Sequence, residues 1–297
     1  MDRRIKDLLK PEILTTMNGL ELVARIIVEG FTSGSNKSHV IGVGQEFSQY
    51  RNYEPGDDLR QLDWKMFARS ERYFVKQADI ETNITIKFML DASRSMAYDE
   101  QGLSKLQYAK VILAALAYLS RKQGDTFGLY IVNNAELKVV HPRFEHQQFM
   151  RFLHELIEAK AESTWKKSGI EQLFDHHGKE MIVFISDLYD DENDILHFIS
   201  RLKTRRNEVI VFHLLGKQEM VLDHQGSFTF KDLESGVKAK VDTVAQKKQY
   251  TESVQLWIRQ LRFTMLDKGI NYHLISMDDP ADQVLHDFLK ARKNLKR

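Results

Sequence analysis

From about residue 83 onward the chain alternates short apolar runs with amphipathic segments, and this alternation constrains its fold most. Apolar residues that recur near every 3.6 positions predict helices, whereas short continuous apolar runs between them predict buried strands. The apolar runs lie at residues 84–90, 125–133, 180–188, 207–215 and 270–277, with a shorter run at 135–142. The amphipathic segments lie at residues 103–123, 145–159, 168–177, 191–205, 249–269 and 280–294.

Buried strands that alternate with helices predict an α/β fold, a doubly wound and mostly parallel sheet of Rossmann-like type with helices on both faces. The preceding sequence predicts an N-terminal helix within residues 5–31, followed by a small segment with two or three short strands and one helix. We therefore divide the chain into an N-terminal part, residues 1–81, and a sheet domain, residues 82–297. Within the sheet domain we expect a hairpin insertion near residues 217–242.

The composition excludes several classes of protein. The 297 residues carry a formal net charge of +1, which argues against a nucleic-acid partner, and they include no cysteine, which excludes disulfides and thiolate metal sites. The most apolar helical run, Val111–Leu119, is much shorter than the roughly 20 residues that a membrane span needs. The N-terminus lacks the pattern of a signal peptide. We expect a cytoplasmic protein without a transmembrane span.

Three oxygen-bearing side chains follow the first apolar run at every second position: Asp91, Ser93 and Ser95. On a loop this spacing can turn three oxygens toward one point, and hard cations such as magnesium take oxygen ligands. The same residue types are favoured helix caps after a strand, so spacing alone leaves both interpretations open. Asp187 follows another buried strand, and a parallel sheet places its functional crevice at the carboxyl ends of its strands.

The stretch DASRSM, residues 91–96, resembles the D-x-S-x-S motif of von Willebrand factor A domains. A longer match lies upstream, where residues 42–81 resemble the pattern of the bacterial "domain of unknown function 58" family. That pattern is G-x-G-x-E-F, then Y-x-P-G-D-D-x-R-x-x-D-W, then A-R and V-K before a glutamate. The resemblance covers roughly Val40 to the C-terminus, and it implies a von Willebrand factor A-like domain.

The resemblance also implies a metal-ion-dependent adhesion site, which binds Mg²⁺ or Mn²⁺ through three loops. The first loop is matched by three residues: Asp91, Ser93 and Ser95. In the second loop Thr164 is the candidate ligand, and Ser163 is the alternative because the usual glycines are absent. Asp187 matches the third loop, where a helix cap is the alternative role.

Such a site implies a non-enzymatic protein-interaction module, in which a carboxylate of a partner protein completes the coordination of the ion. The resemblance further implies that the chain works with a MoxR-type AAA+ ATPase in the assembly or activation of protein complexes. Aromatic side chains dominate many interfaces, and the loops beside the candidate site supply three of them: Tyr98, Trp165 and Tyr189.

The alternative function is a metal-dependent phosphohydrolase of haloacid-dehalogenase-like type, because those enzymes also begin with an aspartate after a strand. They need a second carboxylate two residues further on as acid and base, and this chain has Ser93 there. A nucleic-acid-binding module is a third possibility, but it would need a basic stripe that the sequence lacks.

The segment YEPGDDLRQLDW, residues 53–64, has two interpretations. Proline followed by glycine predicts a type II turn at Pro55–Gly56, and the acids and apolar residues after it predict the start and the packing face of a helix. These assignments favour a structural role, and a docking surface for a partner is the alternative.

Overall fold

The structure is a computed structural model of the chain. It describes residues 9–34, 46–54, 62–79, 84–133, 137–165, 173, 180–189, 194–222, 226–231, 233 and 238–295. The chain divides into two compact units, one drawn from residues 1–36 and 84–297 and the other from residues 37–83. The sequence-based division kept the N-terminal helix with the small segment, whereas the contacts group that helix with the sheet.

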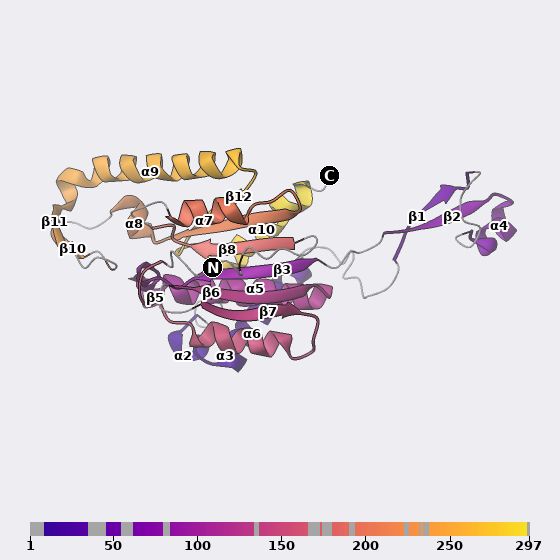
Figure 1. The fold of residues 1–297 in the computed structure, drawn as a ribbon, viewed down its shortest axis with the longest axis horizontal. Coiled ribbons are helices and arrows are strands. Elements are labelled where there is room, and N and C mark those ends of the chain that lie inside the picture. The colour runs from indigo at the N-terminus through magenta and orange to yellow at the C-terminus, as the bar shows by residue number, and fades with distance from the viewer. Residues whose placement is uncertain are drawn as a thin grey trace. The chain divides into compact units, whose positions relative to one another are not determined.

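A six-stranded sheet forms the centre of the first unit, in the order β12-β9-β8-β3-β6-β7 (Figure 1). All neighbouring strands pair in parallel except β7, which is antiparallel to β6. The strands are β3 (Thr85–Asp91), β6 (Thr126–Val132), β7 (Leu137–Arg143), β8 (Glu180–Ser186), β9 (Asn207–Leu215) and β12 (Asn271–Ser276). The predicted α/β fold with a mostly parallel sheet is confirmed.

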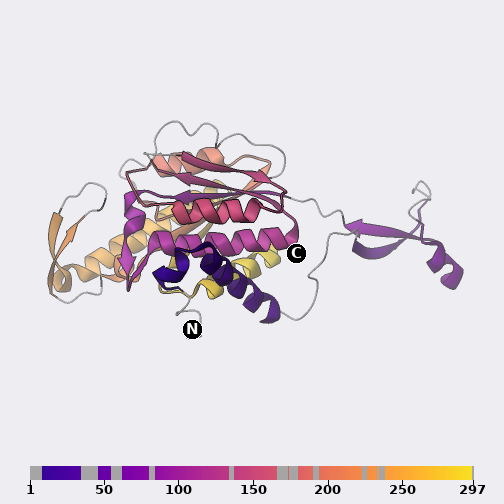
Figure 2. The same cartoon turned by 90° about the horizontal axis from the view of Figure 1, so that it is seen from below.

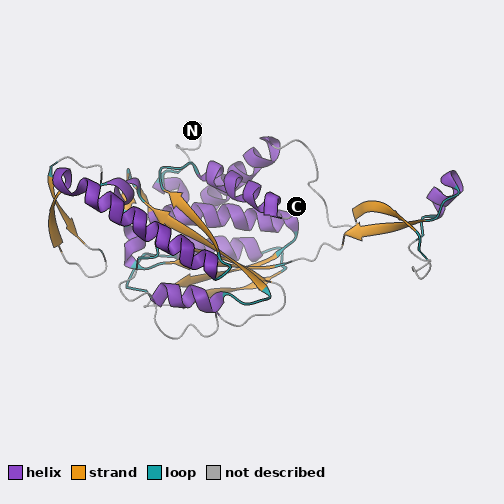
Figure 3. Cartoon of the chain, turned by 90° about the horizontal axis from the view of Figure 1, so that it is seen from above, coloured by secondary structure: helices purple, strands orange, loops and turns teal. Residues whose placement is uncertain are grey.

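Helices cover both faces of this sheet. One face packs against α5 (Lys105–Gln123), α6 (Gln148–Glu158) and α10 (Ala281–Leu295). Helix α3 (Met17–Gly34), which the short helix α2 (Pro11–Leu14) precedes, packs on these three helices rather than on the strands. The other face packs against α7 (Asp194–Leu202) and α9 (Thr243–Asp267). Figure 2 shows α3 in indigo against α5 in magenta, and Figure 3 shows α9 crossing the opposite side.

The strand sequences explain why two apolar cores form. Side chains alternate along a strand, so neighbouring residues face opposite sides of the sheet. In β3, Phe88 and Leu90 belong to the core beneath α5, whereas Met89 belongs to the core beneath α7. Every residue of β8 is buried, as expected for a central strand that is covered on both faces.

Helix α5 has well-defined ends. Ser104 caps its first turn: the Ser104 hydroxyl accepts a hydrogen bond from the Gln107 N–H, and the Gln107 side chain accepts one from the Ser104 N–H. Gly124 ends the helix with φ 74°, a left-handed conformation that glycine adopts without steric cost. The start of α5 is thereby fixed beside the carboxyl ends of the strands.

Shorter elements lie around the edge of the first unit. A 3-10 helix (Arg94–Ala97) follows β3, and a small ladder of β4 (Asp99–Glu100) with β5 (Leu103–Ser104) leads into α5. Helix α8 (Lys217–Val221) follows β9, and an antiparallel hairpin of β10 (Ser227–Lys231) and β11 (Lys238–Asp242) comes next. The helix expected at residues 168–177 lies outside the described residues, except for Leu173.

The second unit contains β1 (Glu46–Asn52) paired in antiparallel with β2 (Phe74–Asp79), and helix α4 (Trp64–Ser70). Asp63 caps α4, since its carboxylate accepts hydrogen bonds from the N–H groups of Lys65 and Met66. The turn expected at Pro55–Gly56 lies outside the described residues. In neither unit does a described helix combine the length and the apolar character that crossing a bilayer requires.

Candidate functional site

Asp91 ends β3 at the carboxyl edge of the sheet, with none of its surface exposed. Its Oδ1 accepts a hydrogen bond of 2.9 Å from the Ser93 N–H. Its Oδ2 accepts a hydrogen bond of 2.6 Å from the hydroxyl of Ser186, the last residue of β8. Because β3 and β8 are neighbours in the sheet, the predicted acid lies beside the loop that carries the second predicted acid.

A row of hydrogen bonds connects the first loop to Asp187. The Ser93 and Ser95 hydroxyl oxygens lie 3.1 Å apart, and the Ser95 hydroxyl donates to Asp187 Oδ1 over 3.1 Å. The same Asp187 oxygen accepts the Tyr189 N–H over 3.3 Å. The two serines and Asp187 are buried, so their oxygens form a single polar cluster inside the protein.

The capping interpretation does not account for Ser93. This residue precedes the 3-10 helix, but its hydroxyl makes no capping hydrogen bond to that helix. The hydroxyl instead contacts Ser95, within the cluster that leads to Asp187. The arrangement therefore favours a role for the Ser93 oxygen in the cluster over a role in starting a helix.

The second predicted loop lies against the first. The Glu162 N–H donates to Ala92 O over 3.0 Å, and the Arg94 N–H donates to Ser163 O over 2.8 Å. Ser163 has φ 65°, a left-handed conformation that few residues other than glycine adopt. Thr164 follows it and is exposed. The loop with the predicted threonine thus lies directly beside the serine loop.

A buried lysine orders the chain just before this second loop. The Lys110 ammonium group on α5 donates to the carbonyl oxygens of Ile157 and Ala159, over 2.8 and 2.7 Å. These carbonyls belong to the last turn of α6 and to the residue that ends it. Burial lowers the pKa of Lys110 to about 8.

Trp165 does not lie on the surface. It is 3% exposed and packs edge-to-face against Phe184 and Phe198, with ring centroids 5.8 and 5.1 Å apart. This corrects the expectation that Trp165 offers an aromatic contact to a partner. Tyr98 is half-buried, and its hydroxyl donates a hydrogen bond to Glu100. Tyr189 is the most exposed of the three aromatic residues, with 44% of its surface accessible.

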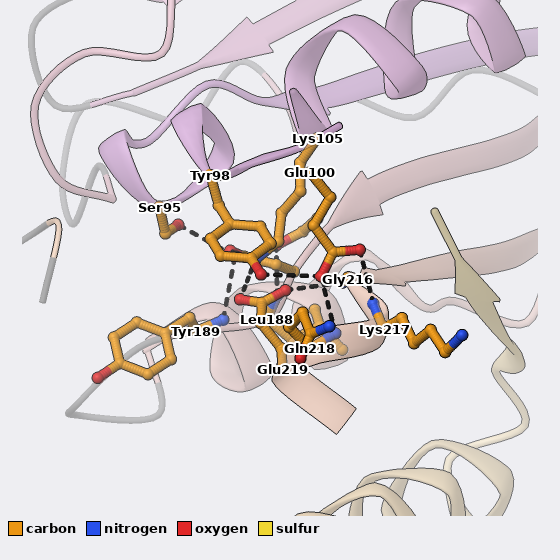
Figure 4. A network of polar contacts seen from close by, with 12 residues as sticks. Ser95, Tyr98, Glu100, Lys105, Leu188, Tyr189, Gly216, Lys217, Gln218 and Glu219 are labelled. Atoms are coloured by element: carbon orange, nitrogen blue, oxygen red, sulfur yellow. Dashed lines mark hydrogen bonds and ion pairs between the residues drawn. The ribbon is translucent and has the colours of Figure 1, made fainter. Parts of the chain in front are cut away.

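Two charged residues that the sequence analysis did not identify complete the cluster (Figure 4). The Lys105 ammonium group donates to Asp187 Oδ2 over 2.8 Å and to Glu219 Oε1 over 2.7 Å. It also lies 5.1 Å from the centre of the Tyr98 ring, a distance typical of a cation–π contact. Lys105 is 1% exposed, so its charge is held inside the protein.

One sequence signal could have identified Lys105. It is the first residue of α5, where the helix dipole favours acidic side chains and disfavours a cation. A lysine at this position therefore calls for an acidic partner elsewhere in the fold. Glu219 carries no comparable signal, because its position depends on how α8 follows β9.

Glu100 fixes α8 above the site. Its carboxylate accepts the N–H groups of Lys217 and Gln218, over 3.0 and 2.7 Å, together with the Tyr98 hydroxyl over 2.8 Å. Gly216 makes this close approach possible: a Cβ there would lie 2.5 Å from Tyr98 Cε1 and 2.6 Å from Glu100 Oε1. A side chain at position 216 would push α8, and Glu219 with it, away from Lys105.

Burial determines how these groups ionise. Burial and the nearby Asp187 carboxylate together raise the pKa of Asp91 to about 6. Burial alone would lower the pKa of Lys105, but Asp187 and Glu219 raise it above its usual range, so the lysine stays charged. His213, which pairs with Ser186 across β8 and β9, has its pKa lowered to about 3 by burial.

The donor set fits a hard divalent cation. The candidate ligands Asp91, Ser93, Ser95 and Asp187 present only oxygen atoms, which magnesium and manganese accept. Burial and the neighbouring Asp187 carboxylate both disfavour the charged form of Asp91, so a cation bound here would stabilise that form. No described part of the chain contains three or more histidines or acids grouped as metal ligands, so a metal site in that part would depend on serine hydroxyls as well as carboxylates.

The sheet is mostly parallel, a D-x-S-x-S loop follows its central strand β3, and an aspartate follows the neighbouring strand β8. This combination defines a von Willebrand factor A-like domain. The profile of the family described as "Protein of unknown function DUF58" matches residues 49–256, and the chain belongs to this family. The match includes Asp91, Asp187 and the newly identified Glu219.

The chain is also similar to uncharacterized proteins of two mycobacteria. It is 25% identical over 236 residues to "Uncharacterized protein Rv1480" of Mycobacterium tuberculosis. The aligned region covers 78% of this chain and 74% of that protein. The same values hold for "Uncharacterized protein Mb1516" of Mycobacterium bovis.

Two solved structures are more distantly similar. The conserved hypothetical protein BatB from Bacteroides thetaiotaomicron shares 13% identity with a TM-score of 0.46, covering 71% of this chain and 99% of that one. The SpRpn10 VWA domain shares 12% identity with a TM-score of 0.39, covering 69% of this chain and 94% of that one.

Proposed function

We propose that this chain is a protein-interaction module that binds Mg²⁺ or Mn²⁺ with Asp91, Ser93, Ser95, Thr164 and Asp187. The observation that carries the proposal is the chain of buried hydrogen bonds that runs from Asp91 through Ser93 and Ser95 to Asp187. A bound ion would supply a positive charge that accepts one further ligand from a partner protein. A glutamate or aspartate side chain is the favoured ligand, because hard cations prefer carboxylate oxygens.

The charges around the site agree with this role. Asp91, Asp187 and Glu219 carry three negative charges, and Lys105 carries one positive charge. The cluster therefore has two negative charges in excess, which a divalent cation neutralises. A neutral cluster leaves room for the negative charge of a partner's carboxylate in a partly desolvated crevice.

The geometry offers little support for the phosphohydrolase alternative. An enzyme of that type needs a carboxylate at the position of Ser93 to donate and accept the proton. Ser93 is buried, and its hydroxyl already contacts Ser95. We therefore propose a non-enzymatic role.

Tyr189 is the side chain that we assign to the partner surface. It is exposed, and its backbone N–H donates to Asp187, so it lies directly beside the proposed ion site (Figure 4). Large exposed aromatic side chains often supply much of the energy of an interface. The family resemblance suggests a MoxR-type AAA+ ATPase as the protein with which this module works.

Titration calorimetry with Mn²⁺ tests the metal site. The unchanged chain should bind one ion weakly, and Asp91→Ala should abolish this binding while the circular dichroism spectrum stays the same. Ser200→Ala is the control, since Ser200 lies on α7 and donates only within its own helix. Unchanged Mn²⁺ binding in Asp91→Ala would exclude the proposed site.

Affinity capture from the native host tests the partner. The captured proteins should be lost when a chelator is added and also when Asp187→Ala replaces the unchanged chain. Capture that survives both changes would show that the crevice is not the interface.

A further inference from the structure

We propose that Lys105 is a fixed internal cation of this site, whose ammonium group cancels one carboxylate charge and so limits how tightly a divalent cation binds. The inference rests on the metal site proposed above and adds a residue that determines its affinity. It follows from the ion pairs of 2.8 Å to Asp187 and 2.7 Å to Glu219.

The backbone of Lys105 cannot shift easily. Its N–H donates to Tyr98 O over 2.9 Å, and the preceding residue, Ser104, caps α5. The side chain is 2% exposed, so the ammonium group has no open route to solvent. Lys105 is therefore a fixed part of the cluster, unlike a surface lysine whose side chain moves freely in solvent.

The second partner of the lysine is also held in place. Glu219 Oε1 accepts from Lys105, while its Oε2 accepts the Gly216 N–H over 2.7 Å. The Tyr250 hydroxyl on α9 donates to the carbonyl oxygen of Glu219 over 2.8 Å. Since both charges are fixed, the excess charge of the cluster is a built-in property, and changing either residue should change the metal affinity in a known direction.

A purely structural role for the lysine would give a different pattern. If Lys105 only tied α5 to α8, then removing either partner would disturb the site and weaken metal binding in both cases. If it limits the affinity, then removing the lysine must strengthen binding and removing Glu219 must weaken it. The sign of the change therefore separates the two roles.

Three variants measured with Mn²⁺ alone test the proposal, by calorimetry and by the loss of the free-ion signal in electron paramagnetic resonance at neutral pH. Lys105→Met should tighten Mn²⁺ binding about tenfold or more, because a nearby positive charge is removed. Glu219→Gln should weaken it by about the same factor. The double variant, which carries both Lys105→Met and Glu219→Gln, keeps the excess charge of the unchanged chain. Its Mn²⁺ affinity should therefore lie within about threefold of the affinity of the unchanged chain.

The double variant also protects the test against misfolding. Lys105→Met alone leaves Asp187 and Glu219 without their cation, which can unfold a protein. In that case the effect of Lys105→Met is measured in the Glu219→Gln background, where one of these carboxylates is already neutral. Binding that tightens from Glu219→Gln to the double variant supports the proposal.

The two proposals fail in different ways. Equal Mn²⁺ affinity in all four proteins would leave the metal site in place and overturn the role of Lys105. Weaker binding in a folded Lys105→Met, or no tightening in the Glu219→Gln background, would also overturn it. If none of the four proteins binds Mn²⁺ at millimolar concentration, the metal site itself is excluded, and the role of Lys105 with it.

Discussion

The hydroxyl of Ser186 donates a hydrogen bond of 2.6 Å to Asp91 Oδ2, and it joins the carboxyl ends of two neighbouring strands inside the protein. The same hydroxyl oxygen accepts the Leu188 N–H over 2.9 Å. Ser186 and Asp91 have no exposed surface, so no solvent competes for these bonds. Ser186 thereby positions both the first carboxylate and the start of the Asp187 loop.

Replacing Ser186 with alanine should lower the free energy of unfolding by about 1–3 kcal/mol, because it leaves a buried carboxylate oxygen and a backbone N–H without their partner. Denaturant unfolding of the metal-free protein measures this change. Ser200→Ala removes a serine hydroxyl that donates within a helix, and it should change the stability by less than about 0.5 kcal/mol. Equal effects of the two variants would contradict the role assigned to Ser186.

The raised pKa of Asp91 makes the metal-free protein less stable as the pH rises. The folded chain keeps the proton of Asp91 up to about pH 6, whereas an ordinary aspartate releases it near 3.8. Over this interval the folded state binds more protons than the unfolded state, so the free energy of unfolding falls as the pH rises from 3.8 to about 6. The contribution is on the order of 2–3 kcal/mol.

Asp91→Asn should remove this contribution while keeping the shape of the side chain. We expect the unchanged chain to lose stability relative to Asp91→Asn across that interval, in a buffer that contains a chelator. Thermal unfolding at a series of pH values measures the difference. Parallel profiles for the two proteins would show that Asp91 ionises normally.

His213 should act in the opposite direction. Its pKa is lowered from 6.5 to about 3 by burial, so only the unfolded chain takes up this proton between the two values. The free energy of unfolding therefore falls as the pH drops below 6.5, by up to about 1.4 kcal/mol per pH unit. His213→Gln should flatten this acid limb, and acid unfolding that is the same with and without the histidine would contradict the prediction.

Gly216→Ala should lower the free energy of unfolding by about 1–3 kcal/mol, because the new methyl group would overlap Tyr98 and Glu100. The matched control is Gly30→Ala on α3, where no atom beyond its chain neighbours and the nearby backbone of its own helix lies within 4 Å of the added Cβ. That control should stabilise the protein by about 0.5–1 kcal/mol, since alanine favours the helix. Chemical denaturation of both variants checks the contrast, and a neutral Gly216→Ala would mean that α8 does not approach Tyr98 so closely.

Tyr189 and Trp165 should respond differently to replacement by alanine. Tyr189→Ala should weaken capture of the partner by about 1–2 kcal/mol and leave the melting temperature unchanged, because the side chain is exposed. Trp165→Ala should instead destabilise the fold by about 3–5 kcal/mol, because it empties space against Phe184 and Phe198. If Tyr189→Ala leaves partner binding unchanged, the interface does not include Tyr189.

Much of the fold was predictable because its causes are local. Continuous apolar runs identify β3 and β8 as buried strands, and the rule for parallel sheets brings Asp91 and Asp187 to one edge. The first loop was recognisable because Asp91, Ser93 and Ser95 lie close together in the sequence.

The rest of the cluster depends on contacts between distant segments. Lys105 and Glu219 are more than a hundred residues apart, and only the path of α8 over the site brings them together. The burial of Trp165 depends in the same way on α7, which supplies Phe198. An exposed loop and a loop whose tryptophan enters the core have similar sequences, so pattern alone placed Trp165 on the surface.

Lys105 and Lys110 both belong to α5, and they bind different segments of the chain. Lys105 binds Asp187 after β8, and Lys110 binds the carbonyl oxygens at the end of α6. Successive residues of an α-helix are rotated by about 100° and shifted by about 1.5 Å. An insertion or deletion of one residue between these lysines would therefore turn one of them away from its carbonyls or carboxylates. Both sets of contacts require the same number of residues between the two lysines. Insertions and deletions in this family are therefore expected to fall outside this part of α5.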